Sequence, residues 1–367
     1  MPTLNRDRLR RFQTLLKEHG FDCYLACTPI SMGYLAGFFE GGGERMLVMA
    51  VPPEGEPAMI VPALSETHAR LTGIQNIRAW KDGEDPGVLF ESFAEEWGLK
   101  TAVIGVDDET PAGFLLRMQQ ALPAALFKCA GDVMAEVRKR KEPEELELMR
   151  RAARIADAAL GDLLEAARAG VTEADLQRAL LSSMMNKGGL ASWCIVAAGP
   201  NGAEPHHSTS DTAVKEGDVL VADWGCQVGH YGSDTTRTIC IGTASGEAKK
   251  VYQVVYDAQA AARERIRPGV PCQEIDRAAR KVIEDAGYGE FFVHRTGHGI
   301  GMMGHEPPFI VEGSESPLQE GQCFSVEPGV YLPGRFGVRI ENIVTVTSDG
   351  HESLNEEPAA SLIETGA

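Results

Sequence analysis

One short stretch of the chain concentrates side chains that could bind a metal ion. Residues 294–308 read HRTGHGIGMMGHEPP, with His294, His298 and His305 inside twelve residues and glycines on both sides of His298. Imidazole nitrogens are common metal ligands, and glycines let the backbone approach such a site closely. The plainer interpretation is a turn that carries surface histidines. The stretch offers too few ligands for a complete site, so the others must come from elsewhere in the chain.

The segment 219–241 pairs two acidic residues in a predicted hairpin. It reads VLVADWGCQVGHYGSDTTRTICI, and a turn centred between Val228 and Gly229 would place Asp223 directly opposite Asp234. Opposed residues of an antiparallel pair have Cβ atoms only ~4.5–5.5 Å apart, and like charges at that distance destabilise a sheet. Such a pair therefore needs a compensating positive charge.

The segment 323–346 repeats this arrangement. It reads CFSVEPGVYLPGRFGVRIENIVTV, and a turn centred on Gly334 would place Glu327 opposite Glu341. A single acid is more simply explained as a turn cap or as the partner of a neighbouring Lys or Arg. Four acids, placed symmetrically about two turns, favour a bound cation that cancels their repulsion.

His298 is the natural fifth ligand of this site. Five side chains, four of them carboxylates, are more than one small cation usually takes from a protein, so shared carboxylates suggest two metals roughly 3.5–4 Å apart. Oxygen-rich ligation with one imidazole favours Mn²⁺ and is compatible with Co²⁺, Zn²⁺ or Fe²⁺.

The composition narrows the class of protein. The net charge of −18 disfavours binding to nucleic acid, because a polyanion repels phosphate backbones. No stretch approaches the ~18–20 uninterrupted apolar residues of a membrane span. The charged N-terminal segment has no apolar signal core, and the eight cysteines are scattered without a C-x-x-C pair. We therefore expect a cytoplasmic protein with free thiols, with no nucleic-acid or membrane partner.

The pattern of elements predicts two domains. A helical pattern ends at Gly20, and the apolar runs FDCYLAC, RMLVMAV, PAMIVP and TAVIGV then alternate with helical or loop segments. This alternation is typical of an α/β domain, which we assign to residues 1–135. The charge run RKRKEPEELE at 138–147 opens a long helix and marks the start of a second domain, residues 136–367.

The second domain contains a faint internal repeat. RAGVTEADLQRA begins at Arg168 and RPGVPCQEIDRA begins at Arg267, and Gly188 and Gly287 follow at the same offset of 99 residues. Two related units, each of two helices followed by strands, would fold about a pseudo-twofold axis. Duplicated halves commonly place a site between them, where ligands should be sought.

These motifs together resemble a known family. DWGCQVGHYGSDTTRT, HRTGHGIGMMGHEPP, SVEPGVY and GVRIEN are similar to the signature of the pita-bread metallopeptidases, and most similar to that of prolidases (Xaa-Pro dipeptidases) and bacterial aminopeptidases P. Residues 1–135, with YLAGF at 34–38, resemble the creatinase-type N-terminal α/β domain. Methionine aminopeptidases lack this domain. Residues 136–367 resemble the α+β pita-bread catalytic domain with its pseudo-twofold symmetry. The resemblance implies a homodimer in which the N-terminal domain of one chain lies near the active site of the other.

The resemblance also implies a metal centre and a reaction. Asp223 would bind one metal, His298 and Glu327 the other, and Asp234 and Glu341 would bridge them. A hydroxide between the ions would attack the amide bond between an N-terminal residue and a following proline, in short peptides of the Xaa-Pro or Xaa-Pro-Yaa type. Glu327 would carry the proton from this water to the leaving amine.

Three further residues match catalytic positions of the family. His206, in GAEPHHSTSD, and His305 would donate hydrogen bonds to the scissile carbonyl or to the tetrahedral oxyanion. Arg339 would orient acids near the metals. The resemblance gives less support to His207, taken as a neighbour, and to His294, taken as a residue behind the ligands.

Phe309 departs from the pattern of several microbial prolidases. They have an arginine directly after the HEPP element that binds the free carboxylate of a dipeptide, and Phe309 occupies this position here. The departure favours acceptance of longer Xaa-Pro-Yaa peptides, although another arginine could serve. Two alternatives are a hydrolase of a non-peptide amide and a non-catalytic pita-bread binding module. Retention of all five ligands and of His206 disfavours the module.

Overall fold

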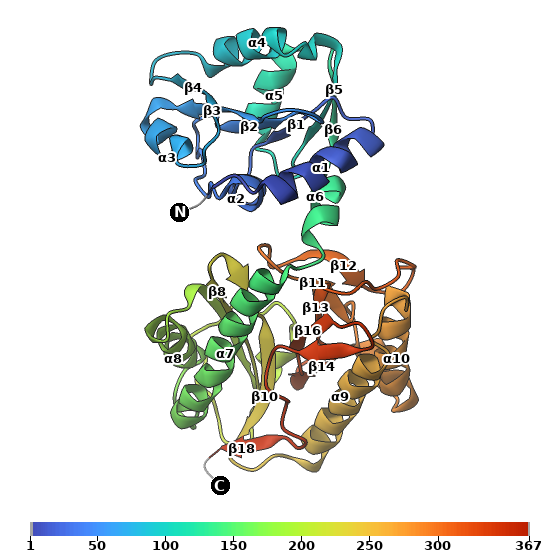
Figure 1. Ribbon diagram of the computed structural model, residues 1–367. Coiled ribbons are helices and arrows are strands. Elements are labelled where there is room, and N and C mark those ends of the chain that lie inside the picture. The colour runs from blue at the N-terminus through green and yellow to red at the C-terminus, as the bar shows by residue number, and fades with distance from the viewer. Residues whose placement is uncertain (1–2, 366–367) are drawn as a thin grey trace. The chain divides into compact units, whose positions relative to one another are not determined.

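The chain divides into two compact units. The computed structural model describes residues 3–365, and the units are Met1–Arg138 and Lys139–Ala367 (Figure 1). The end assigned to the first domain from the sequence, residue 135, lies within α6 (Gly131–Arg138), a helix of the first unit. None of the helices between residues 3 and 365 is both long and apolar enough to cross a bilayer.

The first unit is built on a mixed six-stranded sheet with strand order β4-β3-β2-β1-β5-β6. The four apolar runs singled out in the sequence supply its central strands, and β1 and β2 are buried along their whole length. The elements of this unit are α1 (Arg6–Glu18), β1 (Cys23–Ala26), α2 (Pro29–Ala36), β2 (Val48–Val51), β3 (Ala58–Pro62), α3 (Glu66–Arg70), β4 (Asn76–Trp80), α4 (Pro86–Glu96), β5 (Val103–Val106), α5 (Ala112–Ala121), β6 (Leu126–Cys129) and α6.

The two edge strands of this sheet were not predicted. Strands β4 and β6 flank the sheet, and most of their residues are exposed or half-buried. An edge strand has a neighbour on only one side, so its sequence does not need the continuous apolar run of a central strand. The apolar runs therefore identified the core of the sheet but not its borders.

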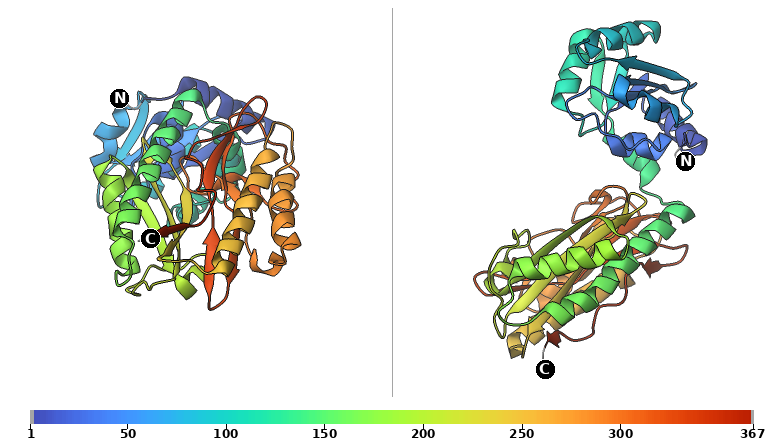
Figure 2. Two further views of the ribbon diagram at one scale, coloured as in Figure 1. Left: turned by 90° about the horizontal axis from the view of Figure 1, so that it is seen from below. Right: turned by 90° about the vertical axis from the view of Figure 1, so that its left-hand side faces the viewer.

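The second unit contains two sheets and two helix pairs. The sheets have the strand orders β18-β10-β8-β7, with β9 paired to β8, and β12-β11-β13-β16-β17, and a separate hairpin is formed by β14 and β15. The helix pair α7 and α8 and the pair α9 and α10 lie on opposite sides of this unit, with the strands between them (Figures 1 and 2). The elements are α7 (Pro143–Ala166), α8 (Glu173–Asn186), β7 (Leu190–Ala198), β8 (Val219–Val228), β9 (Tyr231–Gly232), β10 (Thr235–Ile241), α9 (Gly246–Glu264), α10 (Cys272–Asp285), β11 (Gly297–Gly299), β12 (Glu306–Ile310), β13 (Cys323–Val326), β14 (Gly329–Leu332), β15 (Phe336–Arg339), β16 (Asn342–Val346), β17 (His351–Ser353) and β18 (Ile363–Thr365).

The structure confirms the internal repeat. Helices α8 and α10 have 14 residues each and begin 99 residues apart, at Glu173 and Cys272. The residue before each helix forms an isolated antiparallel bridge, Thr172 with Ala213 and Pro271 with Pro317. Equivalent positions in the two halves therefore carry the same local structure.

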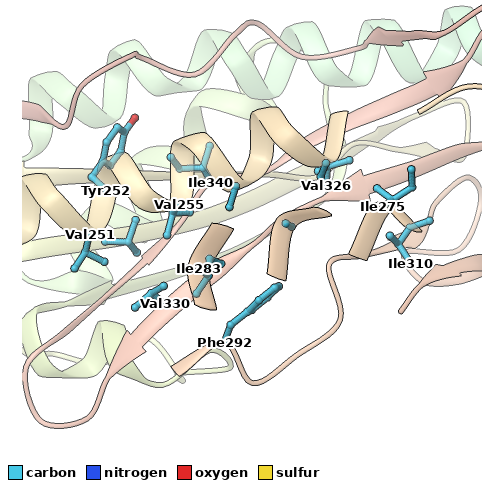
Figure 3. Packing of buried hydrophobic residues seen from close by; sticks show 14 of the residues in the cluster. Val251, Tyr252, Val255, Ile275, Ile283, Phe292, Ile310, Val326, Val330 and Ile340 are labelled. Carbon is cyan, nitrogen blue, oxygen red and sulfur yellow. The ribbon is translucent and has the colours of Figure 1, made fainter. Parts of the chain in front are cut away.

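Each half has its own apolar core. In the C-terminal half, Val251 and Val255 of α9 and Ile275 and Ile283 of α10 pack with residues of β12 to β15 (Figure 3). In the other half, α7 and α8 pack on β7, β8 and β10 around the fully buried Trp224. Complete burial of one Val or Ile side chain contributes about 1.5–3 kcal/mol, so each core fixes its helices and strands firmly. The strands that carry the acidic residues are thus backed by packed cores.

Candidate metal centre

The first hairpin has a different register from the one predicted. Asp223 pairs with Thr236, not with Asp234, because the turn is formed by Gly229 and His230, which have φ of 56° and 72°. A two-residue turn with positive φ at both central residues matches the twist of the flanking strands. The sequence prediction centred the turn one residue too early because only one of these two residues is a glycine.

Asp223 and Asp234 nevertheless face the same pocket. Thr236 lies opposite Asp223, and Asp234 is two residues before it, so side-chain alternation places Asp223 and Asp234 on one face of the sheet. Both side chains line the same cavity. The two acids are diagonal neighbours, not directly opposed ones.

The second hairpin has the predicted register. Val326 pairs with Asn342, and Gly329 pairs with Arg339 beyond it, which places Glu327 opposite Glu341. A bridge between Glu341 and Thr236 joins this hairpin to the first, and the Thr236 hydroxyl donates a hydrogen bond of 2.7 Å to Glu341 Oε2.

His298 enters the same pocket from β11, between two glycines at positions where the neighbouring backbone leaves no room for a side chain. A Cβ atom at Gly297 would lie 1.8 Å from the Ser325 carbonyl oxygen, and one at Gly299 would lie 2.4 Å from the Glu306 carbonyl oxygen. The backbone N–H of His298 donates to Ser325 Oγ at 2.9 Å. The glycines therefore serve the close packing of backbone beside the imidazole, as the sequence predicted.

The hydrogen bonds of His298 leave one ring nitrogen facing the acids. Its Nδ1 is 3.1 Å from the carbonyl oxygen of Gly299, to which Nδ1–H donates. Its Nε2 is 3.3 Å from Glu327 Oε1 and 3.8 Å from Asp234 Oδ2. A metal-ligating histidine usually donates its second N–H to a carbonyl or carboxylate in this way. Asp234, His298 and Glu341 each offer one possible ligand atom, and these three atoms lie within 4.8 Å of one another.

The acids are held in an unfavourable electrostatic environment. Burial raises the pKa of Asp234 and of Glu341 well above the usual carboxyl range, and the neighbouring Glu341 and Glu327, respectively, raise them further. Burial also raises the pKa of Glu327 to about 7. Burial and the nearby His305 lower the pKa of His298 to about 3, so its imidazole is neutral at physiological pH. Without a cation, the site favours protonated carboxyls and a neutral imidazole.

Arg339 compensates for part of the negative charge that these acids carry when they are ionised. Its buried guanidinium donates to Asp223 Oδ2 at 2.7 Å, to the Tyr331 hydroxyl at 3.0 Å and to Thr236 Oγ1 at 3.0 Å. The same Tyr331 hydroxyl is 2.8 Å from His294 Nε2, whose Nδ1–H donates to the Arg295 carbonyl oxygen. Burial lowers the pKa of His294 to about 4, so it too is neutral and can accept from Tyr331.

The donor atoms fit a divalent cation. Asp223 Oδ1 and Glu341 Oε1 are buried and have no hydrogen-bond partner among the described residues. Buried carboxylate oxygens are normally paired, since an unpaired one carries a large desolvation cost. Four carboxylates and one neutral imidazole with a free lone pair form an oxygen-rich ligand set for Mn²⁺ and related ions.

These residues line one cavity of about 650 Å³ in the second unit. Its walls include every side chain that the sequence proposed as a ligand or catalytic group: His206, Asp223, Asp234, His298, His305, Glu327, Arg339 and Glu341. The rings of His305 and His298 have centroids 3.8 Å apart. His207 is not among the lining residues, and its Nε2 lies 3.0 Å from Glu173 Oε2, which fixes the loop that presents His206.

The sequence did not identify the remaining wall of the cavity. Trp193, Ile195 and Val293 line it without belonging to any motif, because they come from two separate segments, whereas Pro205 directly precedes His206 in GAEPHHSTSD. Arg295 also lines it, and its position between His294 and His298 was the one available signal. Phe309 is not among the lining residues.

Arg295 is in contact with Phe309 and with His305. Its guanidinium carbon lies 4.6 Å from the centroid of the Phe309 ring, within the range of a cation–π contact. Its Nη2 lies 3.3 Å from His305 Nδ1. The positively charged Arg295 thus lines the cavity and contacts Phe309, the position at which the family resemblance led us to expect an arginine.

Comparison with known proteins identifies the family of the chain. Residues 147–348 match the model of Metallopeptidase family M24, and residues 8–140 match the Creatinase/Prolidase N-terminal domain. The chain is 39% identical to the probable dipeptidase PepE of Mycobacterium tuberculosis over 349 residues, which cover 91% of this chain and 90% of that protein. It is 36% identical to an Xaa-Pro dipeptidase of Lactobacillus delbrueckii subsp. lactis, with 95% of each chain covered.

A solved structure shows the same architecture. The recombinant prolidase of Thermococcus sibiricus superimposes with a TM-score of 0.93 at 34% identity, covering 97% of this chain and 98% of that one. The predicted fold class, a creatinase-like α/β domain followed by an α+β pita-bread domain, is confirmed. The chain belongs to metallopeptidase family M24.

Proposed function

We propose that this protein is a di-metal peptidase that hydrolyses the amide bond between an N-terminal residue and a following proline. The observation that carries this proposal is the convergence of three buried carboxylates, the half-buried Glu327 and His298 Nε2 in one cavity, where two carboxylate oxygens have no hydrogen-bond partner within residues 3–365. The names of the relatives, a dipeptidase and an Xaa-Pro dipeptidase, support the choice of substrate.

Five residues would hold two divalent ions, with Mn²⁺ favoured and Co²⁺, Zn²⁺ or Fe²⁺ compatible. Asp223 would serve one ion, His298 and Glu327 the other, and Asp234 and Glu341 both. When bound, such ions activate a water molecule as the nucleophile and polarise the scissile carbonyl. All five residues lie in the second unit, to which we assign catalysis.

Glu327 is suited to proton transfer. Its Oε1 accepts a hydrogen bond of 2.9 Å from Ser325 Oγ, which fixes the orientation of the carboxyl group. In the metal-free site, burial raises the pKa of Glu327 to about 7, and bound cations would lower this pKa. Glu327 would accept the proton of the attacking water and deliver it to the nitrogen of the departing proline.

His206 and His305 would stabilise the oxyanion. Both line the cavity that holds the acids, and an N–H of each would donate to the scissile carbonyl oxygen as negative charge develops on it. Arg339 would hold Asp223 in place through its 2.7 Å contact, so that this carboxylate keeps its position when substrate enters.

The cavity wall supports short peptides as substrates. Trp193, Ile195 and Val293 offer apolar surface to the substrate side chains, whereas Arg295 offers a positive charge. The free carboxylate of an Xaa-Pro dipeptide would pair with Arg295, which takes the role that Phe309 cannot fill. We therefore favour dipeptides over Xaa-Pro-Yaa peptides, in contrast to the inference from Phe309 alone.

We further propose a cytoplasmic homodimer. All eight cysteines are unpaired and seven of them are buried, which supports a reducing compartment. The dimer rests on the family resemblance, and a monomer in light scattering at micromolar concentration would contradict it.

The proposed function is tested with a panel of substrates. Protein loaded with Mn²⁺, Co²⁺ or Zn²⁺ should cleave Xaa-Pro dipeptides, should cleave matched Xaa-Ala dipeptides much more slowly, and should lose activity after exhaustive chelation. Equal cleavage of Xaa-Pro and Xaa-Ala would contradict the proline specificity. Full activity in the chelated protein would contradict the metal centre.

Binding of metal should displace protons from carboxyl groups. Because burial raises the pKa of Glu327 to about 7 and those of Asp234 and Glu341 as well, the metal-free site holds protons at pH 6.5, whereas His298, with a pKa of about 3, holds none. Metal affinity should therefore rise with pH between 6 and 8, by up to about tenfold per pH unit for each displaced proton.

Isothermal titration with Mn²⁺ at pH 6.5, in buffers of different ionisation enthalpy, measures the number of protons released. We expect at least one proton per chain, and fewer from the variant Asp234→Asn. A binding enthalpy that does not depend on the buffer would show that the acids are already ionised in the metal-free protein.

His206→Ala should separate catalysis from metal binding. Loss of one oxyanion donor lowers kcat by about 10²–10³, whereas the metal content measured by elemental analysis should be unchanged. His19→Ala, at an exposed position after α1, serves as the control and should retain wild-type kcat. If the metal is lost together with His206, this residue is a ligand and not an oxyanion donor.

Arg295→Met should change the preference between Ala-Pro and its C-terminal amide. A charge-assisted hydrogen bond contributes ~1.5–3 kcal/mol, so kcat/KM for Ala-Pro should fall about 10- to 150-fold more than kcat/KM for Ala-Pro-amide. Arg295→Lys keeps the charge and should lose less. An equal loss for both substrates would mean that Arg295 acts only on His305 and does not bind the carboxylate.

A further inference from the structure

A buried ion pair outside the cavity joins two residues that the proposed mechanism does not use. Lys141 Nζ lies 2.5 Å from Glu306 Oε1, and the two side chains are 1% and 2% exposed. Neither residue lines the cavity. They are 165 residues apart in the chain, so this contact ties together distant segments of the second unit.

Glu306 adjoins the part of the chain that carries the cavity histidines. It follows His305 directly and pairs with Gly299, the neighbour of His298, in the ladder between β11 and β12. The loop 300–305 joins these two strands. His305 lines the cavity while the side chain of Glu306 is buried outside it, so fixing Glu306 fixes the end of the loop that presents His305.

Lys141 comes from a segment that is itself held in place. Its backbone N–H donates to the Gly321 carbonyl oxygen at 2.7 Å, and Arg140 forms an antiparallel bridge with Gln322. The space around the ion pair is tight, because a Cβ atom at Gly301 would lie 2.7 Å from Glu306 Oε1 and 2.9 Å from Lys141 Cε. The ammonium group therefore has a fixed position from which it can orient the carboxylate.

A buried ion pair is a weak source of stability, since removing two charges from water costs about as much as their attraction returns. Its directional, charge-assisted hydrogen bond does restrict geometry. We propose that Lys141 is a positioning residue, which acts through Glu306 to set the location of His305 relative to His298 and the scissile carbonyl. This inference rests on the proposed function of the same site.

A double-mutant cycle with His305 tests the proposal. Lys141→Met should lower kcat for Ala-Pro by up to about 10²-fold, the effect of a small misplacement of a catalytic group, with little change in KM or metal content. In the His305→Ala background, the same substitution should lower kcat by less than about threefold, because the residue through which it acts is gone. A merely structural role would give equal losses in both backgrounds and would overturn the proposal.

Two further variants keep the cycle interpretable. Glu306→Gln removes the negative charge but retains a hydrogen-bond acceptor for Lys141. If Lys141→Met does not fold, Glu306→Gln replaces it in the double-mutant cycle with His305→Ala. Arg263→Met breaks the ion pair of Arg263 with Glu357, away from the cavity, and should retain wild-type kcat. A loss of kcat in Arg263→Met as large as in Lys141→Met would also overturn the proposal.

A readout without turnover separates this proposal from the proposed function. In protein labelled with ¹⁵N-histidine, the ring signals of His305, assigned by their loss in His305→Ala, should shift in Lys141→Met and Glu306→Gln but not in Arg263→Met. Unshifted signals would overturn the positioning role even if the wild type cleaves Xaa-Pro. If the His305 signals shift in these two variants but the wild type cleaves no Xaa-Pro peptide, the positioning role is supported and only the proposed function is contradicted.

Discussion

Mutual repulsion among four carboxylates clustered in one cavity is the constraint that the rest of the second unit depends on. Asp223, Asp234, Glu327 and Glu341 line one cavity, and of these four described acids only Asp223 accepts a hydrogen bond from Arg339. Burial and mutual repulsion raise the pKa of Asp234 and of Glu341 strongly, because both effects disfavour the ionised carboxylates. A divalent cation would remove that cost, and two buried carboxylate oxygens that lack a hydrogen-bond partner in the described part of the chain are available to it.

The duplicated architecture explains how acids so distant in sequence meet. Each half of the unit packs its own helix pair against a hairpin, and the bridge between Thr236 and Glu341 joins the two hairpins. The packed cores on both sides resist separation of the strands, so the acids cannot relieve their repulsion by moving apart. Rigid strands, with Gly297 and Gly299 beside His298, thus hold a ligand set in a geometry that favours metal binding over an empty site.

The fold class and the converging residues could be predicted because they leave local signals. The second hairpin turns symmetrically about Gly334, so the pairing of Glu327 with Glu341 could be predicted by counting residues. In the first hairpin, His230 adopts a positive φ that the sequence does not indicate. The predicted turn of that hairpin was therefore displaced by one residue. The edge strands β4 and β6 lack an apolar run, and Trp193 and Val293 meet only in the folded chain. What depends on tertiary contact, such as the stacking of Arg295 on Phe309, could not be read from the sequence.

The most direct test of the central claim is anomalous diffraction from crystals of the protein soaked in Mn²⁺, collected at the manganese absorption edge. We predict two anomalous peaks per chain within the cavity, both in contact with Asp234 and Glu341, and none in the cavity of the variant Asp234→Ala. A cavity with a single peak, or with none while Mn²⁺ occupies other sites, would contradict the assignment of the four carboxylates and His298 to a two-metal centre.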